Sequence, residues 1–150
     1  MKAIYRLEEV HYHHFDMLDE EDVEERLLIG YFSSIEKMNT AINICIENGI
    51  NPKNIRISTF FDNFTENQKY VYVLSHVYSI IQQDGNYLDY DYIFPPYSNR
   101  KKCLKLKSML IQKERYAFSN NRCYDIQPPD GFYISNDEID FIYHSICKKI

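Results

Sequence analysis

Three histidines and seven carboxylates lie close together near the start of the chain, in the stretch HYHHFDMLDEEDVEE at residues 11–25. Imidazole and carboxylate groups are metal ligands. A dense run of carboxylates can also attract a basic protein, or it can simply face solvent. The elements that position this stretch decide which of the three roles is open to it.

His11 and His13 are the candidate metal ligands. Alternation along a β-strand places them on the same face, and Asp16 or Asp19 could add an oxygen ligand. Zinc sites, however, take further ligands from a rigid frame, whereas these histidines run directly into a polar loop. We therefore expect no metal and no other cofactor. Metal-dependent activity at His11 and His13 is kept as a second alternative function.

The acidic run is the candidate surface for a basic protein partner, because complementary charge speeds encounter and sets specificity. Met17, Leu18 and Val23 stand among the acids and favour a contact role, since a purely solvating loop has no use for apolar side chains. The alternatives are a solvated hairpin tip and a loop whose apolar residues fold back onto the domain. The partner-binding residues expected here are Asp16, Asp19, Glu20, Glu21, Asp22, Glu24 and Glu25.

A basic segment, RKKCLKLK at residues 100–107, offers a different function. Arg100, Lys101, Lys105 and Lys107 could contact phosphates, which makes a nucleic-acid-associated regulator the first alternative. The simpler interpretation is the solvent side of an amphipathic helix. A net charge of −5 repels nucleic acid at long range, so direct nucleic-acid binding is not the favoured function.

Enzymatic function has little support. The chain has no GxSxG, P-loop or HExxH motif, and only four glycines. Its four cysteines are far apart, with no CxxC spacing, which is typical of reduced thiols in a cytoplasm. Residues 1–12 lack the features of a secretion signal, and no apolar run reaches the length of a membrane span. We expect a cytoplasmic protein without catalytic residues.

The chain repeats itself, and the repeat predicts the fold. The matching blocks occur in the same order in both copies: KAIYRLEEV (2–10) with KYVYVLSHV (69–77), LIGYFSS (28–34) with IFPPYSN (93–99), and IRIS (55–58) with FYIS (132–135). The aligned pairs include Tyr5 with Tyr72, Leu7 with Leu74, Phe32 with Tyr97, and Ser33 with Ser98.

Periodicity predicts the elements of each copy. Ser33 and Glu36 fit a capping box, Met38, Ala41 and Cys45 share a helical face, and Gly49 ends that helix. Cys103, Leu106 and Leu110 take the corresponding places in the second helix. The expected strands are 2–12, 25–32, 54–60, 69–79, 87–94 and 131–135, and a last helix is expected at 137–149, with Ile139, Ile142, Tyr143 and Ile146 on one face.

The predicted fold class is α+β. We expect a tandem pseudo-two-fold repeat of ββαβ units, with antiparallel sheets carrying helices on one face and an extra C-terminal helix. The repeats are placed at 1–66 and 67–150, and they are expected to pack as one globular unit because a single unit has too little core to stand alone.

The second copy resembles an uncharacterised family of small bacterial ββαβ proteins. The residues that carry the resemblance are YVLSHVY (72–78), YSNRK (97–101) and PPDGFYI (128–134), and it covers residues 69–141, with a weaker echo in 2–60. Pro95 stands where the family has glycine. The resemblance implies the fold and no activity.

Together these features favour a non-enzymatic protein-binding or inhibitory module with an acidic, Tyr-rich surface. The chain holds fourteen Tyr, and its frequent Ile, Asn, Lys and Tyr suggest a bacterial or phage origin. An immunity protein against a toxin, or an inhibitor of a defence or nucleic-acid-binding protein, fits this description.

Overall fold

The computed structural model describes residues 1–13, 23–81, 87–112, 124–126 and 131–145. The chain divides into two compact units, Met1–Lys69 with Glu138–Ile150 and Tyr70–Asp137, which are described one at a time. In chain order the elements are β1 (Lys2–His13), β2 (Val23–Phe32), α1 (Ile35–Glu47), the short 3-10 helix η1 (Pro52–Asn54), β3 (Ile55–Asp62), β4 (Tyr70–Ile81), β5 (Tyr87–Ile93), α2 (Arg100–Ile111), β6 (Tyr124–Ile126) and β7 (Phe132–Glu138).

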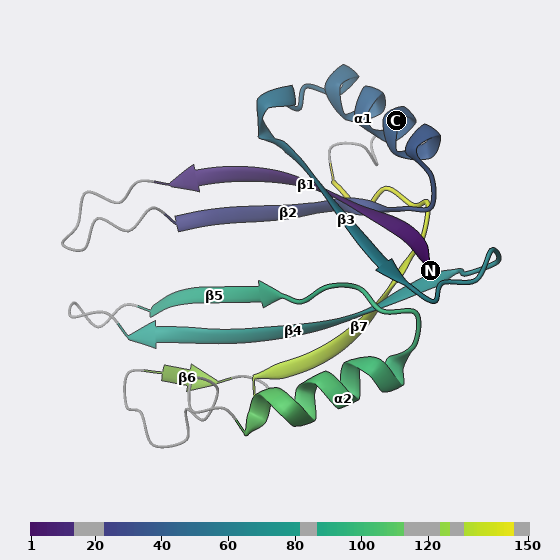
Figure 1. Cartoon of the computed structure of the whole chain (residues 1–150). Helices are drawn as coiled ribbons and strands as arrows, with labels where there is room; N and C mark the ends of the chain where they lie inside the picture. The colour runs from purple at the N-terminus through teal and green to yellow at the C-terminus, as the bar shows by residue number, and fades with distance from the viewer. Residues whose placement is uncertain (14–22, 82–86, 113–123, 127–130, 146–150) are drawn as a thin grey trace. The chain divides into compact units, whose positions relative to one another are not determined.

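The first unit is a three-stranded antiparallel sheet in the order β2-β1-β3, with α1 on one face (Figure 1). Tyr5 pairs with Phe32, and Leu7 pairs with Gly30 on β2 and with Ile57 on β3. Leu7 is fully buried. It belongs to a hydrophobic cluster whose other residues come from the sheet, from α1 and from the loop that follows α1. The predicted α+β class with antiparallel sheets is confirmed.

Helix α1 forms where its periodicity predicts. Met38, Ala41 and Cys45 face the sheet and are buried, as their three- and four-residue spacing requires. The predicted capping box at Ser33 is wrong by one residue. Ser34 is the N-cap, and its hydroxyl accepts a hydrogen bond from the Lys37 amide. The Ser33 hydroxyl instead donates to Asp140.

Gly49 ends α1 as predicted. Its φ of +98° lies in the left-handed region, where glycine carries no Cβ penalty. The Gly49 amide donates to the Ile46 carbonyl and the Ile50 amide donates to the Cys45 carbonyl, which together form a Schellman motif. Ile50 is thereby turned into the core.

The second unit is built around β4, which pairs antiparallel with β5 and β6 and also pairs with β7. Its core holds Leu74, Phe94, Cys103, Leu110 and Phe132. The predicted face of α2 is confirmed at Cys103 and Leu110, which are buried. Asn99 caps this helix by accepting a hydrogen bond from the Lys102 amide.

The predicted C-terminal helix at 137–149 is wrong for the described residues, which end at 145. Asp140 has a φ of +63°, which a right-handed helix does not permit. The Asp140 and Tyr143 amides donate instead to the Tyr31 and Ile29 carbonyls of β2. Residues 138–145 are therefore a segment docked along β2 of the first unit, and this docking makes Ile139 a buried residue.

Gly30 shows how closely this segment approaches β2. A Cβ atom at residue 30 would collide with the backbone carbonyl oxygen of Phe141 and would also crowd the Phe32 ring. Glycine is therefore required at this position by the close approach of another backbone.

Candidate protein-binding surface

Strands β1 and β2 extend past the first residue of β3, and beyond that point they form a two-stranded ribbon. Strand β3 pairs with residues 2–9 of β1, whereas residues 10–13 pair with residues 23–26 of β2 (Figure 1). His13 and Val23 form the last described pair of the ribbon. Residues 14–22, which hold five of the seven carboxylates of residues 11–25, therefore join two strands that pair with each other.

The described part of the ribbon presents polar and aromatic groups. Tyr12 is 64% exposed, and its hydroxyl accepts a hydrogen bond of 2.8 Å from Arg56 on β3. Glu25 is exposed and lies opposite His11. Of the predicted partner-binding residues, Glu24 is placed by its backbone, opposite Tyr12. Asp16, Asp19, Glu20, Glu21 and Asp22 lie outside the described residues.

Two further carboxylates, which are not among the residues predicted from the sequence, lie at the base of the ribbon. Glu8 and Glu9 are 1% and 7% exposed. Glu8 forms an ion pair with Arg26 across β1 and β2, with 3.3 Å between Oε2 and Nε. A buried charge requires such a partner. The sequence feature that could have revealed this pair is the occurrence of two adjacent acidic residues in a strand that is otherwise largely apolar.

Glu9 is shared between two histidines. Its Oε1 lies 2.7 Å from Nε2 of the buried His144, and its Oε2 lies 3.1 Å from Nε2 of the half-exposed His11. His144 belongs to the docked C-terminal segment, so Glu9 ties that segment to β1. The imidazole of His11, a predicted metal ligand, is therefore directed at a carboxylate.

No group of three metal-ligating side chains occurs within the described residues. The side chain of His13 and all of His14 lie outside that part of the chain. The metal-dependent alternative thus has one described ligand, His11, and that ligand already contacts Glu9.

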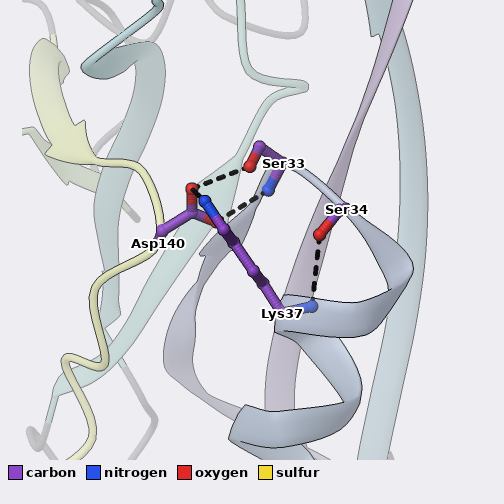
Figure 2. A network of polar contacts seen from close by, with 4 residues as sticks. All are labelled: Ser33, Ser34, Lys37 and Asp140. Atoms are coloured by element: carbon purple, nitrogen blue, oxygen red, sulfur yellow. Dashed lines mark hydrogen bonds and ion pairs between the residues drawn. The ribbon is translucent and has the colours of Figure 1, made fainter.

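A second polar network fastens the docked segment to the start of α1 (Figure 2). Asp140 accepts hydrogen bonds from the Ser33 amide at 2.9 Å and from the Ser33 hydroxyl at 2.7 Å. The Lys37 ammonium lies 3.1 Å from the same carboxylate. All three groups stabilise the ionised form of Asp140.

These contacts decide what the Asp140 network can do chemically. Partial burial raises the pKa of Asp140, but the two hydrogen bonds from Ser33 and the ammonium of Lys37 outweigh burial and leave the pKa below its ordinary value of 3.8. A carboxylate with a lowered pKa is a poor base, so it does not activate the Ser33 hydroxyl as a nucleophile. The network holds the C-terminal segment in place.

The basic residues of α2 do not form one stripe. Lys101 and Lys105 are four residues apart and share a side of the helix, on which both are exposed. Arg100 and Lys107 are seven apart and lie closer to the buried face, where Lys107 is half-buried. The predicted phosphate contacts are thus divided between two sides of the helix.

Cys103 in the same helix is not a reactive thiol. Burial raises its pKa to about 11, although the nearby Arg100 and a hydrogen bond with the Leu74 backbone act in the opposite direction. The thiol is therefore protonated near neutral pH, and the thiolate is the form that attacks electrophiles.

Comparison with protein-family models, with curated proteins and with solved structures finds no match to the chain. Within the part of the chain that the structure describes, no helix is long and apolar enough to cross a membrane.

Proposed function

We propose that this protein is a non-enzymatic binding module that inhibits a basic protein partner by occupying its surface. The class of partner is a toxin, a defence protein or a nucleic-acid-binding protein, in a bacterial or phage setting and in the cytoplasm. The observation that carries the proposal is the pairing of His13 with Val23, the last described pair of β1 with β2, because most of the acidic run is the stretch of chain that connects these two residues.

Charge supports this assignment. The chain has a net charge of −5, and residues 16–25 alone hold seven carboxylates. A concentrated negative patch raises the rate of encounter with a positive surface, and it disfavours partners of like charge. The buried pairs at Glu8 and Glu9 support a rigid base for the ribbon, which lowers the entropic cost of binding.

Exposed aromatic side chains could supply contact area beside the charge. Tyr12 on the ribbon is more than half exposed, and Tyr side chains are enriched at protein interfaces because they combine an apolar ring with a polar hydroxyl.

The proposal is tested by capture of the partner from a lysate of the source cell, with the purified full chain as bait. We expect a basic protein to be recovered at low salt and lost when Asp19, Glu20, Glu21 and Asp22 are all changed to Ser. The matched control changes four other acids to Ser, namely the exposed Glu36, Glu47, Glu66 and Glu138. Both variants remove four negative charges, so only loss confined to the first variant supports the acidic run. Recovery of no protein partner would count against the proposal.

A nucleic-acid-associated role is the alternative, and the exposure of Lys101 and Lys105 on one side of α2 favours it. Binding through lysine neutralises phosphates and weakens steeply as salt rises. A gel shift at low salt tests this function, and a shift that persists after Lys101→Glu and Lys105→Glu excludes α2 as the contact. Metal-dependent activity at His11 and His13 is tested by elemental analysis of untagged protein, where no stoichiometric metal excludes it.

The proposed tandem repeat, and with it the resemblance of residues 69–141 to a family of small ββαβ proteins, concerns the origin of the fold. Tyr5 pairs with Phe32 in the first unit, and the aligned Tyr72 pairs with Tyr97 in the second. Phe32 and Tyr97 are themselves aligned in the two copies, so aligned residues pair with aligned residues, and this supports duplication of one unit. An experimental structure tests it, since the two units should superpose with Leu7 on Leu74.

A further inference from the structure

Helix α2 is held to its unit by one face. Cys103 and Leu110 are buried in the core of the second unit, and the partly buried Leu106 packs against the same core. The opposite side of the helix is open to solvent. There the exposed residues Lys101, Leu104, Ser108 and Ile111 follow one another at intervals of three and four, so they form one stripe along the helix. This stripe, together with Lys105 beside it, is called the outer face of α2.

The outer face combines exposed aliphatic side chains with positive charge. Leu104 is 43% exposed and Ile111 is 40% exposed, and an interval of seven residues places one above the other on the helix. Lys101 is three residues and Arg100 four residues before Leu104, so these two exposed cations flank it on opposite sides. Lys105 is exposed next to Lys101. The aliphatic pair therefore lies between cations.

The charge of α2 is opposite to that of the whole chain. Arg100–Ile111 holds five cations and no carboxylate, whereas the chain has a net charge of −5. Salt limits the reach of a charge to about 8 Å at physiological ionic strength, so the local sign decides which surface the helix attracts. Among the ion pairs of the described residues, none involves Lys101 or Lys105. Both ammonium groups are thus open to an anionic surface.

We propose that the outer face of α2 binds the surface of a lipid bilayer that carries anionic headgroups, with the helix lying on the surface and not crossing it. The cations attract the headgroups, and the long stems of the lysines let their ammonium groups reach them while Leu104 and Ile111 enter the boundary of the acyl chains. The proposal concerns the second unit and makes no use of the acidic run, so it is independent of the proposed function.

The composition of the outer face favours a bilayer over other anionic partners. A nucleic acid offers phosphates, but its phosphate backbone gains nothing from two aliphatic side chains. Protein interfaces are enriched in aromatic residues and depleted in lysine, whereas the outer face holds two lysines and no aromatic residue. Aliphatic residues beside lysines are typical of helices that lie in a bilayer interface.

The test is co-sedimentation of the full chain with vesicles of phosphatidylcholine, with and without about one-third phosphatidylserine, at low salt. We expect binding to the anionic vesicles and none to pure phosphatidylcholine. Lys101→Gln with Lys105→Gln should weaken binding by at least about tenfold, because each cation near an anionic surface contributes a factor of about five. The matched control, Lys53→Gln with Lys69→Gln, removes two exposed charges of the first unit and should bind like the wild type.

Leu104→Ser with Ile111→Ser tests whether the aliphatic pair enters the bilayer. Binding should fall by about threefold or more, and by the same factor at low and at higher salt, because the burial of apolar surface is not screened. Ile35→Ser with Ile46→Ser is the control, since these exposed aliphatic residues lie on α1, and it should leave binding unchanged.

Fluorescence gives a second measure of the contact. The chain contains no Trp, so a single introduced Trp reports the environment of its own position. The emission of Leu104→Trp should shift to shorter wavelength when anionic vesicles are added, and lipids brominated in the acyl chain should quench it. Ile46→Trp on α1 is the control and should show neither change.

Absence of binding to anionic vesicles at low salt overturns the proposal, and so does an equal loss of binding in the Lys53 and Lys69 control. Binding that is unchanged by the substitutions at Leu104 and Ile111 overturns it as well, because the contact would then be with headgroup charge alone. If the wild type does not bind vesicles while the Lys101 and Lys105 variant loses a nucleic acid or an acidic protein, the outer face serves that partner and the proposal is wrong.

Discussion

Glu9 and His144 form a buried hydrogen bond of 2.7 Å, although 135 positions separate them in the chain. Glu9 is in the middle of β1, and His144 is at the end of the docked C-terminal segment. The bond therefore joins the base of the acidic ribbon to the last described part of the chain.

Removing this partner should destabilise the protein. His144→Ala leaves the Glu9 carboxylate buried with one partner fewer, and we expect a loss of about 1–3 kcal/mol in the free energy of unfolding. Urea unfolding measures it. His11→Ala is the matched control, because His11 contacts the same carboxylate from a half-exposed position, and it should cost less than about 1 kcal/mol. Equal losses would contradict the importance of the buried partner.

Gly30→Ala should undock the C-terminal segment, because the new methyl group collides with the Phe141 carbonyl. We expect a cost of about 1–3 kcal/mol and faster hydrogen exchange at the Asp140 and Tyr143 amides, which donate to β2 on either side of residue 30.

Gly49→Ala is the control for that experiment. It has open space for a methyl group but a φ of +98°, so it strains the end of α1 and leaves the docked segment in place. If Gly30→Ala leaves hydrogen exchange at the Asp140 and Tyr143 amides unchanged, the docked segment does not lie as close to residue 30 as the structure shows.

The Asp140 network predicts a loss of stability in acid. The pKa of Asp140 is lower in the folded chain than its ordinary value of 3.8, so the network stabilises the fold above that value and loses its effect as pH falls through the folded pKa. Asp140→Asn should cost about 1 kcal/mol at pH 7, since the side chain is partly exposed. The gap between wild type and variant should close from about pH 5 downward. A gap that stays constant to about pH 2 would contradict this assignment.

Part of the fold follows from local patterns and part does not. The alternation in β1 and the spacing of Met38, Ala41 and Cys45 predict elements correctly, because each is decided within a few residues of chain. Ile139 and Ile142 have the spacing of a helix face, yet they belong to a segment that is not helical. Its amides find acceptors on β2, more than a hundred residues away, and no local pattern reveals such acceptors.

The same distinction applies to the candidate surface. The acidic run is visible from composition, and the alternation on either side of it predicts the two strands that the structure pairs as β1 and β2. The burial of Glu8 and Glu9 was not predicted, since it depends on Arg26 and on His144, and the second of these partners lies in a segment that the sequence assigns to a helix.

The core of each unit is tested by one leucine. Leu7 and Leu74 are fully buried at aligned positions, and each change to Ala should cost about 2–5 kcal/mol. Leu104→Ala is the control, because Leu104 is 43% exposed on α2 and should cost less than about 1 kcal/mol. A loss below about 1 kcal/mol for Leu74→Ala would show that its side chain does not face the core.

The most direct test of the proposed function is the rate of association with the captured partner, measured by stopped flow at low and high salt. Changing Asp19, Glu20, Glu21 and Asp22 to Ser should leave thermal stability nearly unchanged and slow association by about tenfold or more at low salt. The slowing should shrink at high salt, because salt screens the attraction between the two surfaces. Association at the wild-type rate by the folded variant would contradict the account, and the acidic run would then be a solvent-facing loop.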